Sequence, residues 1–210
     1  IFQFGANGEM KQIDHIRHRL DLGSQTYANG KLTNEKVSEI CRVLKEFQNV
    51  MKTYRVEAYK AYGTSAIRET ENTLILLEQI HARTGIQIEV LSNSEQRFLD
   101  YKSIASKGDK FNDIILKGTA IVDIGGGSLQ ISLFDKDTLV STQNIRLGGL
   151  RIKDMLDKLQ PKRAQLEDMM LDMIGEQLET FKKLYLLDSK INNIIVVDDY
   201  VSLILQKKAA

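Results

Sequence analysis

The order of hydrophobic and polar positions in the first part of the chain predicts alternating strands and helices. Residues 1–4 and 10–22 alternate between apolar and polar, and the Asn-Gly turn between them predicts a β-hairpin. A polar loop is expected at 24–32. Thr33 can then cap a helix whose apolar residues recur at helical spacing. Residues 56–62 alternate again and predict another strand.

A second helix is predicted at 65–84, with Gly85 as its C-cap. A short strand at 86–91 follows. The next sequence, Ser-Asn-Ser-Glu at 92–95, has the spacing of a capping box and predicts the start of a third helix. In that arrangement Glu95 is the partner of the capping serine, although the same carboxylate could instead face a cleft and act as a base.

A domain boundary is expected in the polar, glycine-containing stretch at 107–117, which divides the chain into domains at 1–117 and 118–210. The second block predicts strands at 119–124, 129–134, 138–147 and 194–197, and a long amphipathic helix at 163–186. Both blocks combine hairpins with crossover helices. This combination favours an α/β fold.

Composition excludes several classes of protein. The 210 residues include 29 Lys and Arg and 28 Asp and Glu, a net charge of +1 that gives no general reason to bind nucleic acid or an anionic membrane surface. The single cysteine, Cys41, excludes an intrachain disulfide and a cysteine-rich zinc site, and its place on an apolar helix face predicts core packing. No apolar run approaches the roughly 20 residues of a membrane helix. We therefore expect a cytoplasmic protein.

The motif with the clearest chemistry is Asp-Ile-Gly-Gly-Gly-Ser at 123–128, directly after an apolar strand. Consecutive glycines let the backbone approach a ligand and turn several N–H groups toward one point, which suits phosphate oxygens. Ser128 adds a hydroxyl donor, and Asp123 lies where it could hold Mg²⁺. The alternative interpretation is a glycine-rich hairpin with a surface aspartate. The spacing matches neither a Walker loop nor a dinucleotide-binding fingerprint.

A second motif, at 62–69, combines a strand end, a small polar turn and a helix start. Free N–H groups at a helix start attract anions, so Thr64 and Ser65 are candidate phosphate-binding residues. Arg68 lies one turn into the helix and could add a bidentate contact to the same phosphate. The alternative is an ordinary helix start with a solvated arginine.

Together these features resemble the exopolyphosphatase/guanosine pentaphosphate phosphatase (Ppx/GppA) family of the actin-like superfamily. The stretches that carry the resemblance are YGTSAIRETEN at 62–72, VLSNSEQRF at 90–98, IVDIGGGSLQISLFD at 121–135 and IRLGGLRI at 145–152. The resemblance implies an actin-like, ribonuclease-H-type fold with two lobes, of which the second is incomplete here. It also implies Mg²⁺-dependent hydrolysis of the terminal phosphoanhydride of inorganic polyphosphate or pppGpp. Because related proteins often dimerise, a homodimer is a possible assembly.

The resemblance also implies residue roles. Asp123 would lie near the metal and the attacking water, Arg68 would bind the terminal phosphate, and the glycine motif would hold phosphate oxygens. The residues of that motif with this role are Gly125, Gly126, Gly127 and Ser128. Such residues would stabilise the charge that spreads over the phosphoryl oxygens and would hold the attacking water in line.

The sequence departs from the family pattern at four places. Gln96 stands where the family has its general-base glutamate, and Gln130 replaces a second expected glutamate. An amide cannot accept a proton from water at neutral pH, so Glu95 would have to leave its cap to substitute. The family's first phosphate loop is absent, and residue 1 lies within the predicted hairpin, so an upstream segment is expected. A late Gly-Thr element is replaced at 197–201.

These departures leave three hypotheses open. The first is an Mg²⁺-dependent phosphohydrolase that acts on polyphosphate or pppGpp. The second is a relative with impaired catalysis that binds phosphate or nucleotide for sensing or for partner binding, which Gln96 and Gln130 favour. The third is a phosphotransferase of the same superfamily, for which the sequence offers no acceptor site.

Overall fold

The computed structural model describes residues 1–106, 110–136, 138–160, 162–185 and 190–198. The chain divides into two compact units, Ile1–Leu91 and Ser92–Ala210, here called unit 1 and unit 2. This division falls earlier than the domain boundary predicted at 117/118. The reason is that the helix after Ser92 contacts the sheet of unit 2, through Tyr101 and Ser132.

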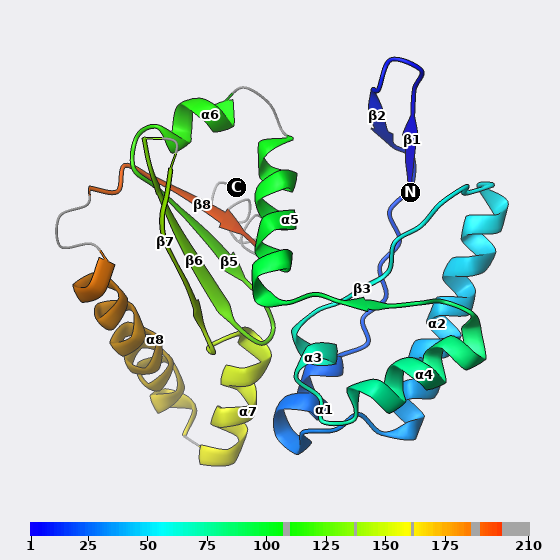
Figure 1. Cartoon of the computed structure of the whole chain (residues 1–210). Coiled ribbons are helices and arrows are strands. Elements are labelled where there is room, and N and C mark those ends of the chain that lie inside the picture. The colour runs from blue at the N-terminus through cyan, green and yellow to red at the C-terminus, as the bar shows by residue number, and fades with distance from the viewer. Residues whose placement is uncertain (107–109, 137, 161, 186–189, 199–210) are drawn as a thin grey trace. The chain divides into compact units, whose positions relative to one another are not determined.

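Unit 1 contains two short sheets and four helices in its described residues (Figure 1). Its elements are β1 (Phe2–Phe4), β2 (Met10–Gln12), α1 (Leu22–Asn29), α2 (Asn34–Thr53), β3 (Tyr62–Gly63), α3 (Ser65–Arg68), α4 (Thr73–Thr84) and β4 (Glu89–Val90). β1 pairs antiparallel with β2, which confirms the predicted hairpin, and β3 pairs parallel with β4.

Several predicted elements of unit 1 differ in the structure, including the strand predicted at 86–91, of which only β4 forms. The strand predicted at 10–22 ends at Gln12. Helix α1 begins at Leu22 and includes most of the loop predicted at 24–32. The strand predicted at 56–62 is reduced to β3, because residues 57–60 are exposed and have no strand beside them to pair with.

The helix predicted at 65–84 is interrupted between Arg68 and Thr73. The side chain of Asn72 both accepts from the Leu32 amide and donates to the Leu32 carbonyl, at 3.3 and 3.0 Å. Thr70 donates to Asn72 at 2.7 Å. Asn and Thr side chains that bond loop backbone compete with helical hydrogen bonding, so the chain breaks into α3 and α4 here.

Helix α2 forms as the sequence predicts. Its cap is Thr33, whose hydroxyl accepts from the Lys36 amide at 3.3 Å. Cys41 is buried on its inner face, which confirms the expected core position. The buried members of this hydrophobic cluster are Leu32, Val37, Ile40, Cys41, Ile67, Leu76 and Ile80. Gly85 ends α4 with φ of 71°, as predicted for a C-cap.

Unit 2 is a four-stranded sheet with helices on both faces (Figure 1). Its elements are α5 (Asn93–Ala105), α6 (Lys110–Ile115), β5 (Thr119–Ile124), β6 (Leu129–Asp135), β7 (Thr138–Ile145), α7 (Gly149–Leu159), α8 (Arg163–Tyr185) and β8 (Asn193–Val197). The strand order is β7-β6-β5-β8, with β8 parallel to β5 and the other pairs antiparallel.

The two faces of this sheet differ in polarity because side chains alternate along each strand. Ile131 and Leu133 of β6 lie in a hydrophobic cluster with Phe181 of α8. Ser132, between them, faces α5 and accepts a hydrogen bond from the Tyr101 hydroxyl. Figure 1 accordingly has α5 beside one face and α8 beside the other. The face toward α5 is the polar one.

The strands and the long helix of unit 2 lie where the sequence predicts them, within about two residues. Helices α6 and α7 were not predicted, and α7 buries Ile152 and Leu156 at helical spacing. The replacement of the Gly-Thr element at 197–201 falls mostly outside the described residues, which end at Asp198. No helix in the described ranges has both the length and the apolar character needed to cross a membrane.

Candidate active site

The glycine motif forms the turn between β5 and β6. Ile124 pairs with Leu129, and the four residues 125–128, here called the glycine loop, are closed by a bond from the Gly125 amide to the Ser128 carbonyl at 2.9 Å. None of these three described glycines has a positive φ. Space is limited at Gly126, where a Cβ would lie 3.1 Å from Cδ1 of Leu150.

The N-terminus of α7 binds the carbonyl side of the glycine loop. The amides of Gly149 and Leu150 donate to the carbonyls of Gly125 and Gly126 at 3.1 and 2.9 Å. Arg151 donates through Nε to the Gly127 carbonyl at 3.0 Å. The first N–H groups of a helix have no partner within the helix, so the loop satisfies them.

This contact is as close as two backbones can come. A Cβ on Gly148 would lie 2.3 Å from the Ser128 nitrogen and 2.4 Å from the Gly126 carbonyl. No side chain larger than a hydrogen therefore fits at Gly148.

The same contact orients the N–H groups of the glycine loop. In a trans peptide the C=O of one residue and the N–H of the next point in opposite directions, and the structure has no cis peptides among its described residues. Because the carbonyls of residues 125–127 point toward α7, the amides of Gly126, Gly127 and Ser128 point away from it. Successive N–H groups that turn to one side form a site suited to an anion.

Asp123 lies at the end of β5, two residues before the glycine loop. It is directly opposite Gln130 of β6, which in turn is opposite Asn144 of β7. Opposite residues share a face of the sheet, and this is the face of Ser132, toward α5. The three side chains form a polar row beside the loop, and Gln130 is buried within it. The sequence predicted Asp123 and Gln130 here but not Asn144, whose place depends on the register of β7.

Glu95 and Gln96 lie in the first turn of α5. The predicted capping box is confirmed: the Ser92 amide donates to Oε2 of Glu95 at 2.8 Å, and the Glu95 amide donates to the Ser92 hydroxyl at 3.2 Å. The hydrogen bonds from Ser92 hold the pKa of Glu95 below its usual value, and its side chain is exposed. Gln96 is half-buried.

The second predicted phosphate site belongs to unit 1. Thr64 and Ser65 lie at the start of the four-residue helix α3, where the Ser65 hydroxyl accepts from the Tyr27 hydroxyl at 2.9 Å. Nη1 of Arg68 donates to the Leu91 carbonyl at 2.5 Å. This bond fixes the half-buried guanidinium at the last residue of unit 1.

The predicted site residues are distributed over both units. Unit 2 holds Asp123, the glycine loop, Gln130, Glu95 and Gln96, whereas unit 1 holds Thr64, Ser65 and Arg68. Sequence reasoning missed Arg151, which bonds the loop. Its only signal was its place in the stretch at 145–152 that resembles the family.

The donor set of unit 2 fits Mg²⁺. Magnesium is usually held by one or two carboxylates together with waters and substrate phosphates, rather than by a cage of protein ligands. Asp123 supplies one such carboxylate beside the anion-binding loop. Among the described residues no group of three or more His, Cys, Asp or Glu side chains is arranged to hold a metal by itself. Asp123 is therefore the residue that would hold the ion, together with substrate oxygens.

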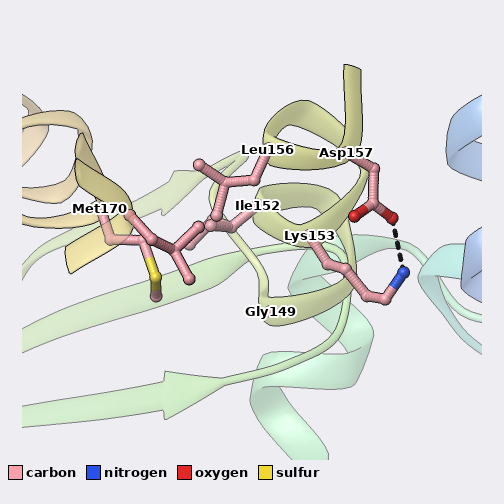
Figure 2. Close-up of a pocket in the computed structure, with 7 residues that line it drawn as sticks. Gly149, Ile152, Lys153, Leu156, Asp157 and Met170 are labelled. Carbon is pink, nitrogen blue, oxygen red and sulfur yellow. Dashed lines mark hydrogen bonds and ion pairs between the residues drawn. The ribbon is translucent and has the colours of Figure 1, made fainter. Parts of the chain in front are cut away.

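A cavity of about 230 Å³ lies between α7 and α8 (Figure 2). It is lined mainly by apolar side chains, including Ile152, Leu156 and Met170, with an ion pair from Lys153 to Asp157 at 2.6 Å. None of the predicted site residues lines it. Its chemistry does not suit a phosphate chain.

Comparison with known proteins identifies the relatives of this sequence. A family model described as the Ppx/GppA phosphatase family matches residues 1–206. A bifunctional 3-dehydroquinate synthase/phosphatase of Fusobacterium nucleatum subsp. nucleatum is 27% identical over 184 residues, which cover 83% of this chain and 27% of that protein. Exopolyphosphatase 1 of Mycobacterium bovis is 26% identical over 172 residues, which cover 81% of this chain and 48% of that one.

The fold is shared with solved structures. An exopolyphosphatase from Cytophaga hutchinsonii superposes with a TM-score of 0.77 at 20% identity, over 99% of this chain and 66% of that one. The predicted α/β fold class is thereby confirmed. The chain spans about half the length of the mycobacterial exopolyphosphatase and about a quarter of the bifunctional protein.

Proposed function

Because the chain belongs to the Ppx/GppA phosphatase family, we propose that it takes part in releasing the terminal phosphate from inorganic polyphosphate or from pppGpp. The observation that carries this proposal is the glycine loop. Its three amides point away from α7, and Asp123 precedes the loop by two residues at the end of β5. This is an anion-binding backbone next to a residue that can hold a metal.

Each residue has a distinct task in this proposal. The amides of Gly126, Gly127 and Ser128 hold the oxygens of the terminal phosphate as charge develops on them. Asp123 would hold Mg²⁺, which when bound supplies neutralisation of phosphate charge. Arg68 of unit 1 is proposed as a further phosphate-binding residue, since a guanidinium pairs with two phosphate oxygens at once.

A second candidate function is phosphate or nucleotide binding without turnover. It is favoured by the amides at Gln96 and Gln130, where the family resemblance places carboxylates. Gln130 is buried in the polar row, directly opposite Asp123. On this hypothesis the pocket binds the ligand for sensing or for contact with a partner.

The experiment measures binding and phosphate release in the same samples of the full-length chain. Polyphosphate and pppGpp are supplied in parallel with Mg²⁺ or with a chelator. The test variant is Asp123→Ala, and the matched control is Asp168→Ala, an exposed aspartate on α8 in the same unit.

The phosphohydrolase proposal expects release from the unchanged chain, a loss of about 10²-fold or more in Asp123→Ala, and no loss in the control. Binding without release in the unchanged chain would instead support the non-catalytic alternative. Absence of both binding and release would overturn both. The ratio of the rates on the two substrates assigns the preferred one.

A further inference from the structure

Two charged side chains of α5, Arg97 and Asp100, are half-buried, whereas two of its apolar side chains, Phe98 and Leu99, are exposed. Arg97 and Asp100 are half-buried on its inner face together with Tyr101, whereas Phe98 on the outer face is 57% exposed. Helices that cover a sheet normally have the opposite polarity. Because a charge buried without a partner costs stability, this reversed pattern indicates a role for the inner charged groups.

The direction of α5 places its inner face over the polar row. Tyr101 reaches Ser132 of β6, and Ser132 contacts Thr142 of β7 at 3.0 Å. The C-terminal end of α5 contacts α6, which bonds Thr119 at the opposite end of β5 from Asp123. The N-terminal half of α5 therefore lies toward the end of the sheet that carries Asp123, Gln130 and the glycine loop.

Three polar atoms in this layer are enclosed and have no hydrogen-bond partner in the described part of the chain. They are Nε of Arg97, Oδ2 of Asp100 and Oδ1 of Asn144, which is one donor and two acceptors. Buried polar groups are nearly always paired, so each unpaired one calls for an explanation.

We propose that Asp100 accepts the proton of the attacking water in this chain, in place of the carboxylate expected at residue 96. The inference rests on the proposed phosphohydrolase function and assigns its base. Gln96 and Asp100 are four residues apart, so their side chains lie on one side of α5 with Cβ atoms about 5–6 Å apart. In this proposal the attacking water lies between them, held by the amide of Gln96 and deprotonated by Asp100.

Asp100 is better suited to this task than the neighbouring Glu95. Glu95 accepts its cap bond from Ser92 and is exposed, and those hydrogen bonds hold its pKa low, which makes it a weak base. Burial raises the pKa of Asp100 above its usual value. A general base is most effective when its pKa approaches the working pH.

The proposed hydrolysis needs only water and the phosphoanhydride as reactants. The water oxygen forms a bond to the terminal phosphorus as the bond from that phosphorus to the bridging oxygen breaks. The bridging oxygen leaves with the electron pair on the shortened polyphosphate or nucleotide. The proton of the water passes to the Asp100 carboxylate and from there to solvent, and inorganic phosphate is released.

The charges that face Asp100 determine how the rate depends on pH. The charged or titratable groups of α5 on this face are Arg97 and Tyr101, and the strands add Asp123 at the end of β5, while burial is what raises the pKa of Asp100. As pH rises through its pKa, Asp100 ionises and becomes able to accept a proton. The rate therefore rises with pH on the acidic side.

The test compares three forms of the full-length chain: unchanged, Asp100→Asn, and the double variant Asp100→Asn with Gln96→Glu. Phosphate release from polyphosphate is measured against pH, and the dissociation constant for polyphosphate is measured beside it. Asp168→Asn, an exposed aspartate of the same unit, is the matched control.

We expect Asp100→Asn to lower kcat by about 10²- to 10⁴-fold, to lose the acidic limb of the profile and to keep its dissociation constant. The double variant should recover much of the rate, because a carboxylate returns one turn away. A merely structural role for Asp100 would give no such recovery.

Two results would overturn the inference, and they are distinguishable. Release by the unchanged chain with the same rate and profile in Asp100→Asn would overturn the assignment of the base and leave the phosphohydrolase in place. No release by the unchanged chain would overturn both.

Discussion

Gly148 packs closely against the glycine loop, and the next residue, Gly149, serves as its matched control. A Cβ at Gly148 would lie 2.3 Å from the Ser128 nitrogen, whereas a Cβ at Gly149 meets nothing within 4 Å. We expect Gly148→Ala to lower the free energy of unfolding by about 1–3 kcal/mol and to weaken phosphate binding, because the loop must move. Thermal unfolding and phosphate titration check both effects.

The control variant, Gly149→Ala, should be neutral or slightly stabilising, by about 0.5–1 kcal/mol, since Gly149 is the first residue of α7. Equal losses in the two variants would contradict the close backbone contact described here.

Asp100 should make the stability of the chain depend on pH. Burial raises its pKa in the folded state, so its contribution is fully present below the unfolded pKa and is lost as pH rises through the folded value. We expect Asp100→Asn to raise Tm near neutral pH and to change it little under acidic conditions. Scanning calorimetry at several pH values measures this difference. A gain that is the same at every pH would argue against a buried carboxylate.

Helix α8 packs into the hydrophobic cluster of unit 2 through Phe181. Phe181 is 4% exposed and lies in the cluster of unit 2, whereas Leu184, on the same helix, is 63% exposed. Phe181→Ala should lower the free energy of unfolding by about 3–5 kcal/mol, since truncation leaves a cavity in the cluster. Leu184→Ala should change it little. Denaturant unfolding of both variants is the measurement.

The elements that the sequence predicts well are those whose pattern and partner agree. Strands β5, β6 and β8 alternate or are continuously apolar, and each has a neighbour in the sheet. Residues 56–62 alternate as clearly, but most of them have no strand to pair with. Periodicity reports which side chains could face a core. It does not report whether a partner strand is present.

Some residues of the candidate site could likewise be predicted from the sequence and others could not. The glycine motif and Asp123 are contiguous in sequence, so their chemistry could be predicted directly. Asn144 could not, because it joins the polar row only through the register of β7. The role proposed for Asp100 likewise depends on which face of α5 it occupies. Residues that join a site from a neighbouring strand or helix have no fixed spacing from the motif along the sequence, so the sequence alone does not reveal them.

At the scale of the whole molecule, each unit has its own hydrophobic cluster. Leu76 and Ile80 belong to that of unit 1, and Phe181 and Ile131 to that of unit 2. Leu76→Ala should remove about 2–5 kcal/mol, mainly from unit 1. Native-state hydrogen exchange resolves this, and the exposed Leu74 on the same helix is the control. Equal loss of protection in both units would show that they unfold as one.

The hydrogen bonds from the start of α7 to the glycine loop couple the stability of the helix start to the conformation of the loop. Any ligand that fixes the loop also steadies the helix start, and by linkage a steadier helix start improves the affinity for that ligand to the same degree. The amide chemical shifts of Gly149, Leu150 and Arg151 are consequently a built-in reporter of loop occupancy. They would register a bound phosphate without a label on the ligand and without turnover.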